Sequence, residues 1–210
     1  MVFIRSISVL LIDAYPAGIT TDGKYLWWCG QDTGSIYQMD KSGNLIQTIN
    51  VGVIELYPYG ITTDGKYLWW IGQDSLNIYQ MDKVGNIIQT IDISAIDNVP
   101  YGITTDGKYL WWIGYQNKSI YQMDKSGNLI QTIAIGVVDS TPGGITTDGK
   151  YLWWTGGQNR NIYQMDKAGN LIQTIDVSAT DRYPAGITTD GKYLWWTGQE
   201  NGIIVQWSKT

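Results

Sequence analysis

The chain has 210 residues, a formal net charge of −5 at pH 7 and 43% hydrophobic residues. This length and hydrophobic content exclude a disordered chain and suit one large domain or two small ones. The acidic balance and the lack of a basic run argue against nucleic acid as a partner.

The first twelve residues place Arg5 ahead of a short apolar run at residues 9–12, as a secretory signal peptide would. The run is shorter than the apolar core of a signal peptide, and Asp13 ends it. We therefore expect no signal peptide, and no stretch is long enough to cross a membrane. Cys29 is the only cysteine, which excludes an internal disulfide and slightly favours the cytoplasm.

Two strings recur along the chain at a fixed period. The string Gly-Ile-Thr-Thr-Asp-Gly-Lys-Tyr-Leu-Trp-Trp occurs five times, and each copy begins 42 residues after the last. The string Ile-Tyr-Gln-Met-Asp-Lys occurs four times, and residues 204–209 are an altered fifth copy. This period is typical of a propeller blade, so we predict one five-bladed β-propeller over residues 1–210. Its repeats begin near residues 15, 57, 99, 141 and 183.

Each repeat predicts four short antiparallel strands, A to D, because β-branched and aromatic runs alternate with turn signals every few residues. In the first repeat we expect strand A at residues 18–21, B at 24–29, C at 36–39 and D at 45–49. Asp22-Gly23 predicts a two-residue hairpin between A and B. Residues 25–29 of strand B are apolar at every position, which predicts that neighbouring blades cover both faces of the strand. The fold class is therefore all-β.

The two ends of the chain predict how the ring closes. Residues 3–7 align with the strand-D segment at residues 171–175, whereas residues 183–209 supply only strands A, B and C of the fifth blade. We therefore expect the N-terminal strand to pair with residues 203–207 and to complete that blade. Ser208 agrees, because it replaces the aspartate that opens the C–D turn in the other repeats.

The pattern Asp-Gly-x-Tyr-Leu-Trp followed by Ile-Tyr-x-x-Asp-x-x-Gly-Asn resembles the blades of NHL-like propellers. The resemblance covers the whole chain but implies a fold rather than a chemistry, since propellers include lectins, hydrolases, lyases and protein-binding platforms. Five tryptophan-rich blades are also similar, in architecture alone, to the tachylectin family of sugar-binding propellers. Blades this alike imply either recent amplification of one unit or an engineered, designed scaffold.

The repeats differ from one another mainly in two places. The A–B and C–D turns are nearly invariant, whereas the B–C loop and the D–A connection vary. In an up-and-down blade the two variable segments share a face, so we predict one uniform face and one diversified face. Ligand binding would explain the diversity, and so would loops that simply drift faster. The B–C loops are residues 31–35, 73–77, 115–119, 157–161 and 199–203, and the first D–A connection is residues 50–59.

Two sets of residues on the diversified face are candidate site residues. The second tryptophan of each pair, with Tyr59 and Tyr101, is a candidate wall of an inter-blade pocket that stacks on a sugar; the alternative is core packing between blades. An acid three residues before each strand-A proline is a candidate carboxylate ring for a cation, or a local cap on that turn. The tryptophans are Trp28, Trp70, Trp112, Trp154 and Trp196. The acids are Asp13, Glu55, Asp97, Asp139 and Asp181.

Three classes of function remain open. A non-enzymatic, multivalent binding module for carbohydrate or peptide, with up to five equivalent sites on a monomer, explains the diversified face. A symmetric scaffold with no dedicated ligand explains the near-identity of the blades. A propeller hydrolase or lyase is the third class, but the lack of histidine removes the usual general base and excludes a Ser-His-Asp triad. We therefore expect no enzyme and no cofactor.

Overall fold

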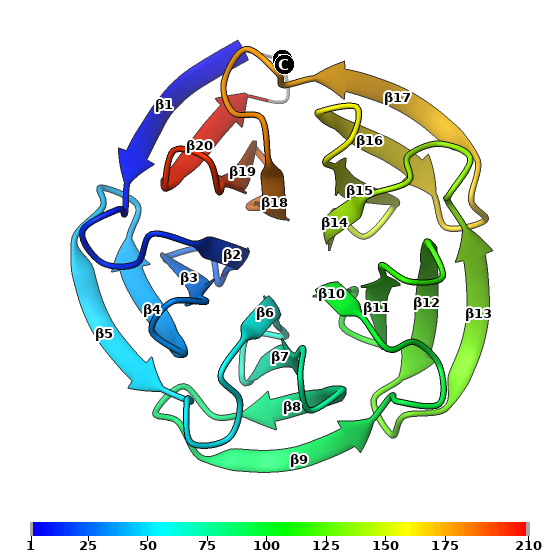
Figure 1. Cartoon of the computed structure of the whole chain (residues 1–210), viewed down its shortest axis with the longest axis horizontal. Helices are drawn as coiled ribbons and strands as arrows, with labels where there is room; N and C mark the ends of the chain where they lie inside the picture. The colour runs from blue at the N-terminus through cyan, green and yellow to red at the C-terminus, as the bar shows by residue number, and fades with distance from the viewer. Residues whose placement is uncertain (1, 209–210) are drawn as a thin grey trace.

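The computed structural model describes residues 2–208, and they form a ring of five blades around a central axis (Figure 1). Each blade is an antiparallel sheet of four strands, and the strands run in order from the axis to the rim. The predicted five-bladed β-propeller is confirmed. No helix within residues 2–208 is long and apolar enough to span a membrane.

The twenty strands divide evenly among the blades. Blade 1 contains β2 (Pro16–Thr21), β3 (Tyr25–Gly30), β4 (Ser35–Asp40) and β5 (Leu45–Asn50). Blade 2 contains β6 (Pro58–Thr63), β7 (Leu68–Gly72), β8 (Asn77–Met81) and β9 (Ile87–Asp92). Blade 3 contains β10 (Pro100–Thr105), β11 (Tyr109–Gly114), β12 (Ser119–Asp124) and β13 (Leu129–Ala134). Blade 4 contains β14 (Pro142–Thr147), β15 (Tyr151–Gly156), β16 (Asn161–Asp166) and β17 (Leu171–Asp176). Blade 5 contains β18 (Pro184–Thr189), β19 (Tyr193–Gly198), β20 (Ile203–Ser208) and β1 (Val2–Ser8).

The N-terminal strand closes the ring. Strand β1 pairs antiparallel with β20, so that Phe3 lies opposite Trp207 and Ser8 lies opposite Ile203, with one irregularity just after Phe3. The predicted pairing of residues 3–7 with residues 203–207 is therefore confirmed. Lys209, at the end of the altered repeat string, lies outside the described residues.

The A–B turn differs from its prediction. The turn of blade 1 has three residues, 22–24, rather than two. The Asp22 carboxylate, rather than a backbone carbonyl, accepts hydrogen bonds from N–H groups of the turn. Asp22 Oδ1 accepts hydrogen bonds from the N–H groups of Lys24 (3.1 Å) and Tyr25 (2.8 Å). Gly23 has a φ of 89°, which only glycine adopts without strain. The same turn is repeated in every blade, which accounts for the invariance of its sequence.

The two tryptophans of strand B pack against different neighbours, as their alternation along a strand predicts. Trp27 packs with Leu68 and Trp70 of blade 2. Trp28 packs with Trp195 of blade 5. Since each blade repeats this arrangement, the paired tryptophans form the hydrophobic core between successive blades.

Close contact between the innermost strands explains the invariant glycine of strand A. A Cβ atom on Gly18 would lie 2.2 Å from the Tyr59 carbonyl oxygen of the next blade. The equivalent glycines of the other four blades are equally crowded by neighbouring backbone. Only glycine therefore lets the five inner strands approach one another this closely.

Ion pairs join successive blades on the uniform face. Lys83, in the C–D turn of blade 2, lies 2.9 Å from the Asp22 carboxylate in the A–B turn of blade 1. The same carboxylate accepts a hydrogen bond from Trp27 Nε1 at 3.2 Å. The A–B and C–D turns therefore vary little because they hold the ring together. The equivalent pairs are Lys41–Asp190, Lys125–Asp64 and Lys167–Asp106.

Candidate ligand-binding cleft

The two variable segments of each blade meet on the diversified face. In blade 1 the Gln31 N–H of the B–C loop donates to the Tyr15 carbonyl of the D–A connection at 3.2 Å. In blade 5 the Gln199 N–H donates to the Tyr183 carbonyl at 3.1 Å. Blades 2, 3 and 4 repeat this bond. The two variable segments of each blade thus lie on the same face, as predicted.

The candidate acid ring is a set of five separate caps. Asp13 is 3% exposed, and its Oδ1 accepts the Tyr15 N–H at 2.9 Å while its Oδ2 accepts the Thr33 N–H at 3.0 Å. Each acid thereby fastens its own D–A connection to its own B–C loop. The acids that occupy this position are Asp13, Glu55, Asp97, Asp139 and Asp181, and all five are buried.

The convergent carboxylate ring is therefore wrong, and the local cap describes the geometry. No group of three or more acidic, cysteine or histidine side chains within residues 2–208 is placed to hold a metal ion. Glu55 fits the cap despite its longer side chain, because its two oxygens accept the N–H groups of Tyr57 and Ser75 at 2.9 Å each.

The candidate tryptophans have no ring face open to a ligand. Trp28 is fully buried and stacks on Tyr37 with 4.4 Å between ring centroids. Of the two alternatives, core packing between blades describes the geometry and the sugar pocket does not, because the ring of Trp28 is enclosed by its own blade and by the neighbouring blade. The other four tryptophans at this position, also fully buried, are Trp70, Trp112, Trp154 and Trp196.

Tyr59 and Tyr101, the second residues of β6 and β10, stack on each other. Their ring centroids are 4.2 Å apart and the rings are nearly parallel, and Tyr115 packs against Tyr101 with 4.8 Å between ring centroids. Burial raises the pKa of both hydroxyls. The two tyrosines close against each other instead of walling an open pocket.

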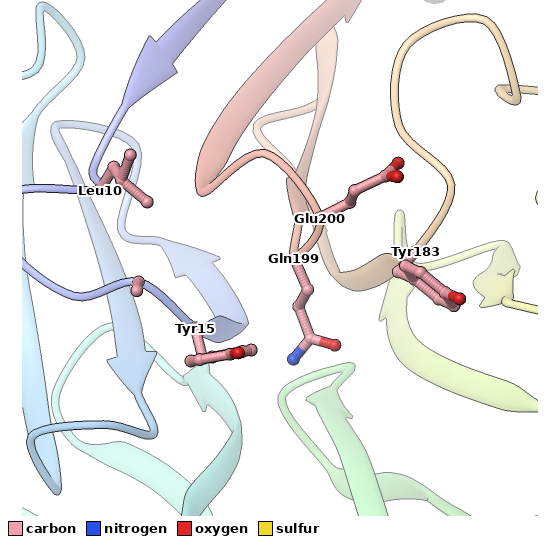
Figure 2. Close-up of a pocket in the computed structure, with 6 residues that line it drawn as sticks. Leu10, Tyr15, Tyr183, Gln199 and Glu200 are labelled. Atoms are coloured by element: carbon pink, nitrogen blue, oxygen red, sulfur yellow. The ribbon is translucent and has the colours of Figure 1, made fainter.

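An open cleft of about 350 Å³ lies between blades 5 and 1 on the diversified face. Figure 2 shows Tyr15 and Tyr183 on either side of Gln199, with Glu200 directed outward above them. The two tyrosines are 53% and 59% exposed, so their rings are available to a ligand as the buried tryptophans are not. The cleft is lined by Leu10, Ala14, Tyr15, Tyr183, Gln199 and Glu200.

Polar contacts fix the two hydrophilic side chains of the cleft. Glu200 Oε1 lies 3.6 Å from the Arg182 guanidinium, and its Oε2 accepts the Arg182 N–H at 3.3 Å. Gln199 Nε2 donates to Gln31 Oε1 at 3.3 Å. The cleft therefore combines two aromatic rings with a held amide and a held carboxylate. That combination gives apolar contact area together with polar groups that fix a ligand's orientation.

The sequence patterns did not single out the cleft residues. Tyr15 and Tyr183 each directly precede a strand-A proline and lie outside every predicted strand. The available signal was a large aromatic residue at a turn position that does not require one, because Val99 and Thr141 stand at the same repeat position in blades 3 and 4. An aromatic side chain that the fold does not require at an exposed position is a candidate contact residue.

Comparison with known proteins shows the fold alone. No family model matches the chain, and no curated protein matches its sequence. Glutaminyl cyclase of Myxococcus xanthus is similar with a TM-score of 0.81 and 13% identity, over 98% of this chain and 94% of that one. A streptogramin B lyase gives 0.59 and 19%, over 97% of this chain and 72% of that one. A chain of a nidogen–laminin complex gives 0.65 and 19%, over 93% and 76%.

These neighbours are propellers that include enzymes and a member of a protein complex. At such low identities the shared fold does not carry an activity from them to this chain. The function has to be argued from the residues of the cleft.

Proposed function

We propose that the protein is a binding module rather than an enzyme, and that it binds a carbohydrate in the cleft between blades 5 and 1. The observation that carries the proposal is the pair of exposed rings, Tyr15 and Tyr183, on either side of the Gln199 amide. The apolar face of a pyranose packs well on an aromatic ring, and its hydroxyl groups bond to amide and carboxylate oxygens. A cleft of about 350 Å³ lies at the lower end of the range for small-ligand sites.

The potential catalytic groups of the chain support binding over catalysis. Burial raises the pKa of the Cys29 thiol, which keeps the thiol protonated and unreactive. The buried acid of each D–A connection is occupied by backbone N–H groups, as Asp13 is. Of the residues that line the cleft, Glu200 alone carries a carboxylate, whereas glycoside hydrolysis ordinarily uses two.

A glycan array followed by isothermal titration calorimetry tests the proposal. We expect binding to at least one sugar class, and we expect Tyr15→Ala and Tyr183→Ala each to weaken it about tenfold or more. Val99→Ala is the matched control, because Val99 occupies the same repeat position in blade 3, away from the cleft. We expect that variant to bind like the wild type.

Two outcomes contradict the proposal. One is binding that neither tyrosine substitution weakens, which would move the ligand to another surface. The other is a lack of binding across all glycans, which would favour the symmetric scaffold with no dedicated ligand.

A further inference from the structure

The cleft belongs to a larger pattern on the diversified face. Tyr183, Tyr15 and Tyr57 occupy the same repeat position in three successive blades, 5, 1 and 2. They are 59%, 53% and 45% exposed. Blades 3 and 4 carry Val99 and Thr141 at this position. Exposed tyrosines therefore cover three neighbouring blades and are missing from this position in the other two.

Each of these tyrosines is fastened to a glutamine of its own blade. The tyrosine carbonyl accepts the glutamine N–H at 3.1 to 3.3 Å in all three blades. An exposed acid follows each glutamine in the sequence. The three Tyr–Gln–acid sets are Tyr183, Gln199 and Glu200; Tyr15, Gln31 and Asp32; and Tyr57, Gln73 and Asp74. In blades 3 and 4 the glutamine position holds Tyr115 and Gly157, so the set is absent there.

The sets of blades 5 and 1 touch each other. Gln199 of blade 5 donates its side-chain N–H to the Gln31 side-chain oxygen of blade 1 at 3.3 Å. Tyr15 lines the cleft between blades 5 and 1 and is itself the tyrosine of the blade 1 set. The cleft is therefore shared between the blade 5 set and the blade 1 set.

We infer that the three sets form one arc that binds an extended, neutral oligosaccharide, with sugar rings stacked on the three tyrosines. This inference rests on the proposed function and names its substrate class. The tyrosine recurs once in each of three neighbouring blades. A surface that repeats in this way suits a polymer of repeating units better than one isolated sugar. The three acids, Glu200, Asp32 and Asp74, repel uronic acids and sulfated sugars, as does the net charge of −5.

The arc also favours a sugar chain over an extended peptide. A peptide commonly binds by adding a strand to a free sheet edge, where it gains backbone hydrogen bonds. In the arc, the glutamine N–H is bonded to the tyrosine carbonyl, and the tyrosine N–H is bonded to the buried acid of its own blade. The surface therefore offers ring faces and side-chain polar groups, which suit the alternating apolar faces and hydroxyls of a sugar chain.

Calorimetry with oligosaccharides of increasing length tests the arc. The probes are cello-, malto-, xylo- and chito-oligosaccharides of one to six units, titrated into the full chain. In one series we expect one ligand per chain and about tenfold or greater tightening between the single sugar and the longer oligomers. Tyr57→Ala should abolish most of this gain and leave binding of the shortest ligand within about twofold. Tyr15→Ala should weaken every length, whereas Val99→Ala should change none.

The outcomes separate the arc from the cleft. Equal affinity at all lengths, several independent single-sugar sites, or a Tyr57→Ala variant that keeps the full gain would overturn the arc and leave the cleft standing. So would an array in which the bound glycans are all acidic. Failure to bind every series and every arrayed glycan overturns both proposals, as does selective binding of peptides. Thermal melting of each variant confirms that it remains folded.

Discussion

The Tyr183 N–H donates a hydrogen bond of 2.7 Å to Asp181 Oδ1, and this bond fixes the position of Tyr183. The second carboxylate oxygen accepts the backbone N–H of Asn201 at 3.1 Å. Asp181 is only 2% exposed, so these contacts replace the water that an ionised carboxylate requires. One buried side chain thereby sets the positions of both segments that build the cleft, the D–A connection and the B–C loop of blade 5.

We expect Asp181→Ala to destabilise the protein by about 2–4 kcal/mol, because at least two backbone N–H groups lose their acceptor inside the protein. It should also weaken ligand binding, since Tyr183 loses its anchor. Urea unfolding measures the first effect and calorimetry the second. The control is Asp92→Ala: Asp92 is exposed and its carboxylate hydrogen-bonds to the N–H and the side chain of Ser94, so its loss should cost less than about 1 kcal/mol. Equal costs for the two variants would contradict the capping role.

Stability should fall as the solution is acidified below about pH 4. Burial alone would raise the pKa of the Asp64 carboxyl, but hydrogen bonds from Lys125, the Tyr67 N–H and Trp69 outweigh it and lower the pKa to about 2. Like contacts lower the pKa of Asp22, Asp106 and Asp190. A lowered folded-state pKa stabilises the fold above the ordinary value of 3.8, and this stabilisation is lost as pH falls from there toward 2.

Urea unfolding at pH 7, 4, 3 and 2 measures this loss. The variant Asp64→Asn lacks one of the titrating carboxylates, so its stability should be lower at pH 7 and should fall less steeply with acid. Stability that stays constant between pH 4 and pH 2 would show that the ion pairs between blades contribute nothing.

Three B–C loops contain a residue in a strained backbone conformation. Leu76, Lys118 and Arg160 have φ angles of 53°, 50° and 57°, at the position that glycine occupies in blades 1 and 5. Such a conformation costs a residue with a Cβ atom about 1–2 kcal/mol. Glycine avoids this strain, but its larger conformational entropy in the unfolded state offsets part of the gain in stability. We therefore expect Lys118→Gly to stabilise the protein by up to about 1 kcal/mol. Lys118→Ala keeps the Cβ atom and should give no such gain; a gain as large as that of glycine would contradict the strain.

The repeat made the fold predictable from the sequence. The same strand pattern recurs in five near-identical copies. The alignment of residues 3–7 with a strand-D segment correctly predicted the strand that closes the ring. The three-residue A–B turn was harder to predict, because it depends on the Asp22 side chain and not on the glycine alone.

The cleft was not predictable in the same way. Trp28 and Tyr15 are both aromatic residues near the diversified face, but one is fully buried and the other is half exposed. The difference arises from how blades 5 and 1 pack together, which depends on contacts between residues far apart in the sequence. The continuous apolar run of strand B favours a covered Trp28, but no pattern within one repeat says whether the Tyr15 ring, just before strand A, is covered or open.

Thr155 links blade 4 to blade 5 inside the core. It is fully buried, its hydroxyl donates to the Ala185 carbonyl at 2.5 Å, and it accepts the Gly144 N–H at 2.8 Å. Thr155→Val preserves the shape of the side chain but leaves both backbone groups without these bonds. We expect it to lower the free energy of unfolding by about 1–3 kcal/mol, as measured in urea.

Thr132→Val, at an exposed position of β13, should change stability by less than about 0.5 kcal/mol. Cys29, Ile71 and Ile113 stand at the same position in blades 1 to 3, so those blades assemble without this bridge. If Thr155→Val is no less stable than Thr132→Val, the bridge contributes nothing in blade 4 either, and the hydroxyl is only accommodated in the core.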